Sequence, residues 1–232
     1  MRILLLGGTG FVGRHIVRSL LSKITTNELT LLNRCSSNMY LYPGIDRICA
    51  DRDNVNELDL LGDTLESYKV DCVIDTSQES NHVKSILDSK LNIPYYVYIS
   101  SASVYDWPPP DDAHMGIFND IAYMHYVKNK VESENMIIDK FGIDSSLIIR
   151  PVYICGPDDN TNRFDYSKWP DVYWNMSTDG NNFTWESKQR KKLEKYDNVA
   201  EFADFVTSLV EKNEVGIVNT KGGEWYRDER SE

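Results

Sequence analysis

Short apolar runs alternate with segments of helical periodicity along most of the chain. The runs have the length of buried strands and lie at Arg2–Leu6, Leu29–Leu32, Arg47–Ala50, Val70–Thr76, Tyr95–Ser100, Ser146–Arg150 and Gly216–Asn219. Apolar residues that recur every three or four positions predict helices over Phe11–Leu21, Val55–Tyr68, His82–Asp88, Asp120–Phe141 and Tyr196–Lys212. Strands that alternate with helices form βαβ units, so the pattern predicts an α/β fold with a Rossmann-type, doubly wound parallel sheet.

Periodicity and composition divide the chain into four segments. Residues 1–157 carry the alternation of strands and helices, and we assign them to the main Rossmann domain. Residues 158–195 hold three tryptophans and many asparagines and aspartates without a clear period, which indicates a small irregular insertion. Residues 196–223 are expected to return to the main domain, and the charged residues 224–232 to form a frayed tail.

Charge and composition narrow the class of protein. The 232 residues include 25 basic and 36 acidic side chains, which gives a net charge of −11. Nucleic-acid-binding proteins use a basic face to displace counterions from phosphates, so this balance disfavours a nucleic-acid partner. No apolar run approaches the ~20 residues of a membrane span, and Ile3–Leu6 is too short for a secretory signal. We therefore expect a cytoplasmic protein without a membrane partner.

The cysteines show no pattern typical of a redox or metal site. Cys35, Cys49, Cys72 and Cys155 form neither a CxxC pair nor a ligand spacing with histidine. In the reducing compartment expected for this chain, we predict that they are free thiols. No metal site is expected.

A glycine-rich turn joins the first predicted strand to the first predicted helix. Glycines without a Cβ atom let the backbone turn tightly and approach a pyrophosphate, and the free N–H groups of the following helix attract that anion. The context of strand, turn and helix indicates dinucleotide binding, and the alternative is a plain tight turn that helps the helix to pack. The expected cofactor-binding residues of this turn are Gly7, Thr9, Gly10, Phe11, Val12 and Gly13.

The residues after the second predicted strand bear on the choice of cofactor. An acidic residue about 20 positions beyond the glycines accepts hydrogen bonds from the adenosine ribose in NAD-binding loops. This chain has Asn33 there, followed by Arg34, so no carboxylate repels a 2′-phosphate and a guanidinium can pair with one. We predict that NADP is preferred and that NAD is also accepted. The alternative is that Arg34 stacks on the adenine or is solvated.

Tyr126 and Lys130 lie four positions apart in the long predicted helix, so both side chains can meet one ligand. A tyrosine has a pKa near 10 and needs a neighbouring cation to act as a base at neutral pH. The serines at 100, 101 and 103 lie at the end of the fifth predicted strand, where a parallel sheet presents groups that contact ligands. A serine hydroxyl at this place can bind the substrate oxygen whose proton the tyrosine takes.

Together these motifs resemble the NAD-dependent epimerase/dehydratase family, the extended and atypical short-chain dehydrogenases/reductases. The similar stretches are GGTGFVG at 7–13, SSASVY at 100–105, YVKNK at 126–130 and RPVYICGP at 150–157. Stretches at 31–34, 51–53, 75–77 and 162–166 are most similar to the branch that includes the chloroplast stem-loop-binding proteins. The resemblance covers about residues 1–166 and, weakly, residues 196–223.

The resemblance implies roles for individual residues. Tyr126 would be the acid/base, Lys130 would hold the nicotinamide ribose and lower the tyrosine pKa, and Ser101 would orient the substrate. Cofactor contacts are implied for Asp51 beside the adenine, for Thr76 and Ser77 along the dinucleotide, and for Pro151, Val152 and Tyr153 against the nicotinamide.

The chain departs from the family in length. Family members are commonly longer, mostly in a C-terminal substrate domain, so a reduced C-terminal substrate-binding part is expected here. The leading hypothesis is an NAD(P)-dependent oxidoreductase or epimerase that transfers hydride at a carbinol carbon of a small molecule, expected to be a sugar or nucleotide sugar. The alternative is a non-catalytic NADP-binding sensor or scaffold. RNA binding rests on the stem-loop-binding branch alone and is opposed by the net charge.

One face of the long predicted helix bears on assembly. It carries a mixed stripe of Tyr123, Val127, Val131, Glu134 and Ile138. The stripe can pack on a second copy, as in the family that the chain resembles, or on the chain's own sheet. We expect a homodimer and leave both packings open.

Overall fold

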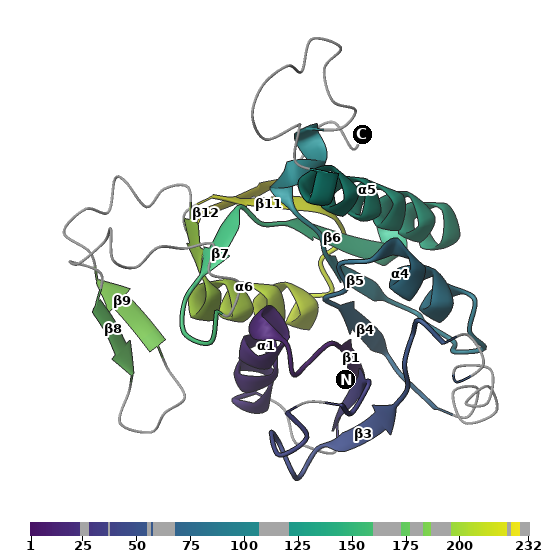
Figure 1. Ribbon diagram of the computed structural model, residues 1–232, viewed down its shortest axis with the longest axis horizontal. Coiled ribbons are helices and arrows are strands. Elements are labelled where there is room, and N and C mark those ends of the chain that lie inside the picture. Colours follow the sequence, from purple (N-terminus) through teal and green to yellow (C-terminus); the bar gives the residue numbers. More distant parts are fainter. Residues whose placement is uncertain are drawn as a thin grey trace.

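The computed structural model describes residues 1–23, 28–36, 38–54, 57, 68–106, 121–159, 173–176, 183–186, 196–221 and 224–227. Within these ranges, an eight-stranded sheet has the order β12-β11-β6-β5-β4-β1-β2-β3 (Figure 1). Its strands are β1 (Ile3–Leu6), β2 (Leu29–Asn33), β3 (Asp46–Cys49), β4 (Cys72–Asp75), β5 (Tyr96–Ile99), β6 (Ser146–Arg150), β11 (Gly216–Lys221) and β12 (Glu224–Arg227). The strands from β3 to β11 pair in parallel, and β12 is antiparallel to β11.

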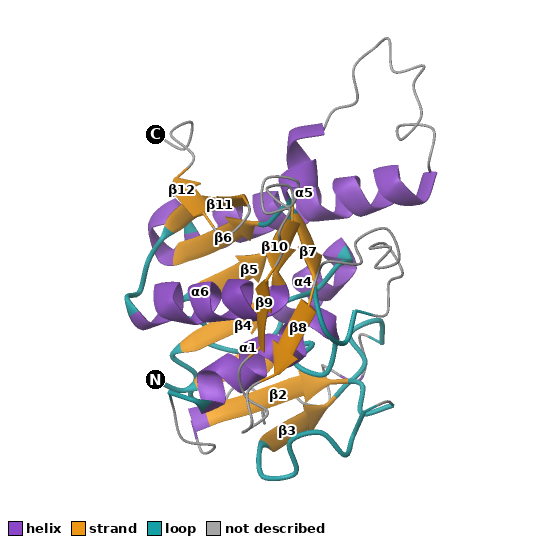
Figure 2. Ribbon diagram, turned by 90° about the vertical axis from the view of Figure 1, so that its left-hand side faces the viewer, coloured by secondary structure: helices purple, strands orange, loops and turns teal. Residues whose placement is uncertain are grey.

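Helices cover both faces of the sheet, so the predicted doubly wound α/β fold is confirmed (Figure 2). The described helices are α1 (Phe11–Leu21), α4 (Ser80–Leu87), α5 (Ile121–Phe141) and α6 (Val199–Glu211), with short 3-10 turns η2 (Ala102–Asp106) and η4 (Ile143–Ser145). The helices α1 and α6 lie on one face and α4 and α5 on the other (Figure 1). The helix predicted over Val55–Tyr68 lies almost entirely outside the described residues.

The two faces of β1 show why the strands are apolar throughout. Consecutive side chains of a strand point to opposite faces of the sheet. Ile3 and Leu5 join the core beneath α1 and α6, whereas Leu4 and Leu6 join the core beneath α4 and α5. A strand that is buried on both faces favours apolar side chains at most positions, which is why an uninterrupted apolar run predicted β1.

The predicted irregular insertion contains regular structure. Within it, β8 (Tyr173–Met176) and β9 (Phe183–Glu186) form an antiparallel pair in which Trp174 lies opposite Trp185. Both segments are rich in aromatic or β-branched residues, which favour strands. The prediction of an irregular segment is wrong for these two strands.

The predicted helix Tyr196–Lys212 begins three residues later than expected. Tyr196–Asn198 form strand β10, which pairs in parallel with β7 (Tyr153–Cys155). The Asn198 side chain then caps α6, because its Oδ1 accepts hydrogen bonds from the backbone N–H groups of Ala200 at 2.9 Å and Glu201 at 3.2 Å.

The residues predicted to be a frayed tail include an edge strand. Glu224–Arg227 form β12, with Thr220 of β11 opposite Trp225. The Trp225 ring lies 5.7 Å from the Phe205 ring of α6, measured between centroids. Backbone pairing and this ring contact hold a strand whose side chains are all exposed, so it has no apolar pattern from which it could be predicted.

The stripe predicted for a homodimer interface is only partly available. Val127 and Glu134 are buried within the chain itself. They face inward because α5 packs on the chain's own sheet. For these two residues, the prediction of an interface with a second copy is therefore wrong. The homodimer remains a prediction, as do the boundaries of the four segments.

Two of the four cysteines are not the free thiols that we predicted. Cys35 and Cys49 form a disulfide with their Cα atoms 5.4 Å apart. Parallel pairing of β2 and β3 places Asn33 opposite Cys49, and the left-handed backbone at Cys35 (φ 53°) follows two residues later. The other two cysteines are free and buried. The cytoplasmic location remains a prediction. No helix among the described residues combines the length and the apolar character needed to cross a bilayer.

Removal of the disulfide should destabilise the protein. The bridge closes a loop with a sequence separation of 14, and a loop of this size contributes about 3 kcal/mol by restricting the unfolded chain. We expect Cys35→Ser/Cys49→Ser to lower the free energy of unfolding by about that amount, measured by urea denaturation. Cys155→Ser is the control for loss of a thiol. Unchanged stability on adding a reductant to the wild type would contradict the assignment.

Candidate cofactor and catalytic site

The glycine turn lies where β1 separates β2 from β4, the point at which the strand order reverses. Gly7 has a φ of +83°, and a Cβ atom there would lie 2.4 Å from Thr76 Oγ1. A Cβ atom on Gly13 would lie 2.2 Å from the Gly7 carbonyl oxygen. Open sheets bind ligands at this kind of crevice, outside the carboxyl ends of the strands. The turn leaves room for the backbone alone, as the sequence predicts for close approach to a pyrophosphate.

The first turn of α1 has no side chain that caps it. Gly10 is the N-cap residue and gives no side-chain hydrogen bond to the helix. The free N–H groups at such an end attract an anion. The rest of the motif lies against this end: Thr9 is buried, and Phe11 and Val12 are half-buried.

The sequence analysis did not predict a charged cluster that holds the loop after β7 against α1. Asp158 forms ion pairs with Arg14 at 3.1 Å and with Arg18 at 3.2 Å. His15 is buried with its Nε2 3.0 Å from the Pro157 carbonyl oxygen, and burial lowers its pKa. The contacts join residues at least 140 positions apart in the sequence, so no local spacing could have indicated them. They fix the segment that follows β7 beside the glycine turn.

Asn33, at the position predicted to contact the adenosine ribose, has a hydrogen-bond donor without a partner among the described residues. The Asn33 Oδ1 accepts a hydrogen bond from the Cys35 backbone N–H at 3.2 Å. Its Nδ2 is buried and has no acceptor among the described residues. Arg34 is exposed and makes no ion pair or hydrogen bond with the described part of the chain. An orphan amide donor and an exposed guanidinium beside a glycine cradle fit the adenosine end of a dinucleotide.

The other predicted adenosine-side residue, Asp51, folds back on its own loop. Its Oδ1 accepts a hydrogen bond from the Asp53 backbone N–H at 3.1 Å. Thr76 and Ser77 lie at the carboxyl end of β4, where Thr76 Oγ1 donates to the Leu6 carbonyl oxygen at 2.9 Å. The end of β4 is therefore joined directly to the start of the glycine turn.

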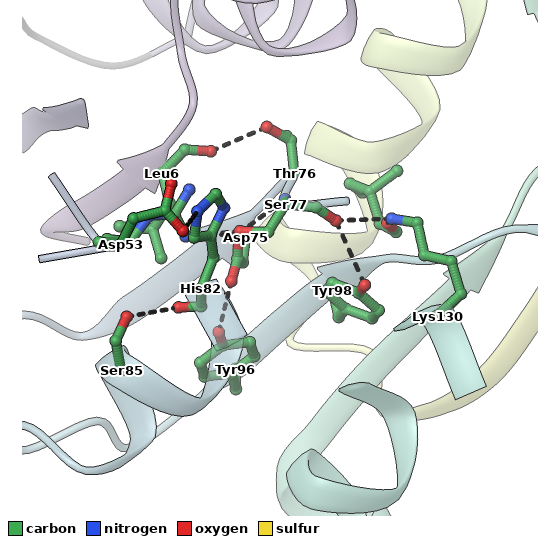
Figure 3. Close-up of polar contacts among 12 residues, drawn as sticks. Leu6, Asp53, Asp75, Thr76, Ser77, His82, Ser85, Tyr96, Tyr98 and Lys130 are labelled. Atoms are coloured by element: carbon green, nitrogen blue, oxygen red, sulfur yellow. Dashed lines mark hydrogen bonds and ion pairs between the residues drawn. The ribbon is translucent and has the colours of Figure 1, made fainter. Parts of the chain in front are cut away.

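Lys130 reaches from α5 to the ends of two strands (Figure 3). Its Nζ donates to the carbonyl oxygens of Ser77 at 2.6 Å and Ile99 at 2.7 Å, and only 3% of the residue is exposed. The Nζ lies 5.8 Å from the centroid of the Tyr126 ring. The structure thus brings Tyr126 and Lys130 together, as their spacing predicts.

Ser101 directly precedes the turn η2, which packs against α5. Its Oγ accepts hydrogen bonds from the Ser103 hydroxyl at 2.9 Å and from the Ser103 backbone N–H at 3.2 Å. The Pro151 carbonyl oxygen accepts from the Ala102 N–H at 2.8 Å, which brings the predicted nicotinamide segment beside Ser101. In that segment Pro151 is buried and Tyr153 is exposed, with Val152 between these extremes.

A buried ion pair beneath this site was not predicted. Glu134 accepts two hydrogen bonds from Arg150, at 3.0 and 2.7 Å, and a third from the Ser100 hydroxyl. Arg150 also donates to the Tyr105 hydroxyl at 2.9 Å. The hydrogen bonds from Arg150 compensate the charge of the Glu134 carboxylate, which allows it to lie in the interior. Arg150 lies on another element, 16 positions along the chain, so no helix spacing indicated the pair.

The buried amine gives the site a measurable pH dependence. Burial lowers the pKa of Lys130 to about 8, so the folded protein disfavours the charged form relative to the unfolded chain. Between about pH 8 and 10 the unfolded chain binds more protons than the folded one, and stability rises with pH. We expect the wild type to gain roughly 2 kcal/mol over Lys130→Met in this range, measured by urea unfolding. Parallel pH profiles for the two proteins would contradict this.

Comparisons with known proteins agree with this geometry. Residues 3–93 match the sequence profile of the NAD dependent epimerase/dehydratase family. The predicted resemblance is confirmed over these residues, and the narrower likeness to the stem-loop-binding branch remains a prediction. A search of curated protein sequences gave no match.

Several solved structures share the fold. A dTDP-glucose 4,6-dehydratase from Bacillus anthracis str. Ames, in complex with NAD, is 13% identical over 98% of this chain and 77% of its own, with a TM-score of 0.63. A UDP-N-acetylglucosamine 4-epimerase from Bacillus cereus is 17% identical over 99% and 82%, with a TM-score of 0.59. A short-chain dehydrogenase/reductase from Veillonella parvula DSM 2008, in complex with NADP, is 12% identical over 90% and 86%, with a TM-score of 0.57. At these identities the similarity establishes the fold.

Proposed function

We propose that this chain, whose residues 3–93 carry the NAD dependent epimerase/dehydratase profile, is an enzyme that transfers hydride at a carbinol carbon with a nicotinamide dinucleotide. The observation that carries the proposal is the position of the Lys130 amine. It lies 5.8 Å from the Tyr126 ring and is bonded to the end of β4, the strand that also contacts the glycine turn. A phenol, a cation and a dinucleotide cradle therefore meet at one edge of the sheet.

In the proposed reaction, Tyr126 takes the proton of the substrate hydroxyl. The positive charge of Lys130 favours the phenolate, and Ser101 donates a hydrogen bond to the substrate oxygen. When bound, the nicotinamide would accept the hydride and, in an epimerase, return it to the other face. The buried Glu134–Arg150 pair holds η2 and α5 together, so that the three side chains keep their spacing.

We propose a sugar or nucleotide sugar as the substrate. Two of the similar structures, the dehydratase and the epimerase, are named for nucleotide sugars, which supports this class. A ring hydroxyl of a sugar is a carbinol of the kind that Tyr126 and Ser101 can bind. A dehydratase needs a further acid/base pair, for which Asp106, Asp111 and Asp112 are candidates by sequence; residues 107–120 lie outside the described residues.

The role of Tyr126 is tested by turnover. Tyr126→Phe removes the proton-accepting oxygen and keeps the ring, so we expect the substrate-dependent absorbance change at 340 nm to fall by about 10²–10⁴-fold on a panel of nucleotide sugars. The affinity for NADP should change little. Tyr123→Phe, on the same helix, is the matched control. Activity that survives in Tyr126→Phe would refute the assignment, and tight binding without wild-type turnover would favour the sensor or scaffold.

We further propose NADP as the preferred cofactor, because Asn33 and Arg34 replace the expected carboxylate. A charge-assisted contact with the 2′-phosphate contributes about 1.5–3 kcal/mol, or roughly 10–100-fold in affinity. Arg34→Ala should weaken NADP binding by that factor and leave NAD binding unchanged, measured by calorimetry at one salt concentration. Arg2→Ala, at the opposite end of β1, is the control. A wild type that binds NAD more tightly than NADP would reverse the preference.

A further inference from the structure

A series of polar contacts connects the loop after β3 with α5, the helix that carries Lys130. Arg52 Nη1 donates to Ser77 Oγ at 2.5 Å and lies 3.4 Å from Asp75 Oδ1. The Ser77 carbonyl oxygen in turn accepts from Lys130 Nζ at 2.6 Å. One residue at the end of β4 therefore contacts both the arginine of the β3 loop and the proposed catalytic amine.

The strand order shows that the contact of Arg52 with the end of β4 joins distant parts of the sheet. The strands β3 and β4 are not neighbours, because β2 and β1 lie between them. The loop that follows β3 and the Arg52 side chain together pass the carboxyl ends of β2 and β1 to reach the end of β4. These are the ends that carry Asn33 and the glycine turn, so Arg52 lies near the proposed adenosine side of the crevice.

Ser77 has little freedom to move. Its backbone N–H donates to Asp75 Oδ1 at 2.8 Å, and its hydroxyl is bonded to the same carboxylate as well as to Arg52. Its carbonyl oxygen accepts from the Tyr98 hydroxyl at 3.2 Å in addition to Lys130, as Figure 3 shows. A buried polar group that loses its partner costs free energy, so this set of bonds selects one orientation of the carbonyl.

Arg52 supplies the charge that this arrangement needs. Asp75 is completely buried, and its other oxygen accepts from the Tyr96 hydroxyl at 2.7 Å. Arg52 is the cation that the described residues place within ion-pair distance of this carboxylate. Removing one partner of a buried ion pair leaves an uncompensated charge, here the Asp75 carboxylate, whose attraction for the Lys130 ammonium is then no longer offset by Arg52. Loss of the Arg52 hydrogen bond also changes the set of bonds that hold Ser77.

The loop that carries Arg52 is itself anchored. Asp53 Oδ1 accepts hydrogen bonds from Asn81 Nδ2 at 2.7 Å and lies 2.9 Å from His82 Nε2, both on α4. Arg52 is thus held in place by contacts on the side of the loop that faces α4, independently of Ser77.

We propose that Arg52 is a positioning residue for Lys130, acting through Ser77 across the cofactor crevice. The inference rests on the proposed function. It predicts that loss of Arg52 weakens contacts of the nicotinamide half of the cofactor, which Lys130 would hold, more than contacts of the adenosine half.

A double-mutant cycle tests the connection. The probes are NADP and 2′,5′-ADP, which lacks the nicotinamide half, and the variants are Arg52→Gln, Lys130→Met and the double variant. We expect Arg52→Gln to weaken NADP binding about tenfold more than 2′,5′-ADP binding, and we expect this extra loss to vanish in the Lys130→Met background. The proposal would be overturned if the fold-change of the double variant equalled the product of those of the two single variants. It would also be overturned if Arg52→Gln weakened the binding of NADP and of 2′,5′-ADP equally.

A second readout needs no ligand. Without the positive charge of Arg52, the Asp75 carboxylate acts on Lys130 unopposed, which favours the protonated amine. The rise in stability that Lys130 produces above about pH 8 should therefore move to higher pH in Arg52→Gln and stay in place in Arg52→Lys. An unchanged midpoint in Arg52→Gln would contradict the proposal.

Controls separate the possible failures. Arg47→Gln removes an arginine of β3 that donates to the Leu41 carbonyl oxygen and should leave both readouts unchanged. If Arg52→Gln does not fold, Ser77→Ala breaks the same series of contacts at its hydroxyl and should weaken NADP binding more than 2′,5′-ADP binding. A wild type that binds neither probe nor NAD refutes the proposed function, and the pH readout then decides the role of Arg52 by itself.

Discussion

The interaction on which the site depends is the burial of the Lys130 amine at the ends of β4 and β5. A protonated amine loses its hydration when it is buried, and hydrogen bonds must replace that hydration. Two carbonyl oxygens, of Ser77 and Ile99, serve this purpose at 2.6 and 2.7 Å. Both oxygens belong to the ends of strands, so these bonds help to fix the position of α5 on the sheet.

Each buried charge around Lys130 has its own partner. Asp75 pairs with Arg52 and Glu134 pairs with Arg150, so each carboxylate is bound to a guanidinium and not to the amine. Lys130 lies between the two pairs and makes its hydrogen bonds to backbone oxygens. The division matters for chemistry, because an amine that is not neutralised by a carboxylate keeps its charge available to a phenolate.

The sequence could indicate those parts of the structure that depend on local periodicity or spacing. The apolar runs located the parallel strands because burial on both faces favours apolar side chains at most positions. The glycine turn depends on one strand end, and the Tyr126–Lys130 spacing depends on one helix face. The Cys35–Cys49 bridge could not be predicted, because it depends on the lateral pairing of β2 with β3. The contact of Arg52 with Asp75 depends likewise on strand order, and strand β12 depends on pairing at an edge.

Two consecutive residues at the end of β4 connect the glycine turn with the Lys130 amine. Thr76 bonds to the Leu6 carbonyl oxygen and fills the space beside Gly7, whereas Ser77 contacts Asp75, Arg52 and Lys130. Neighbouring residues of an extended chain direct their side chains to opposite sides. One short segment can therefore contact the glycine turn with one residue and the Lys130 amine with the next. A displacement of this segment would affect both contacts together, so the glycine turn and the amine are connected through two adjacent residues and two hydrogen bonds.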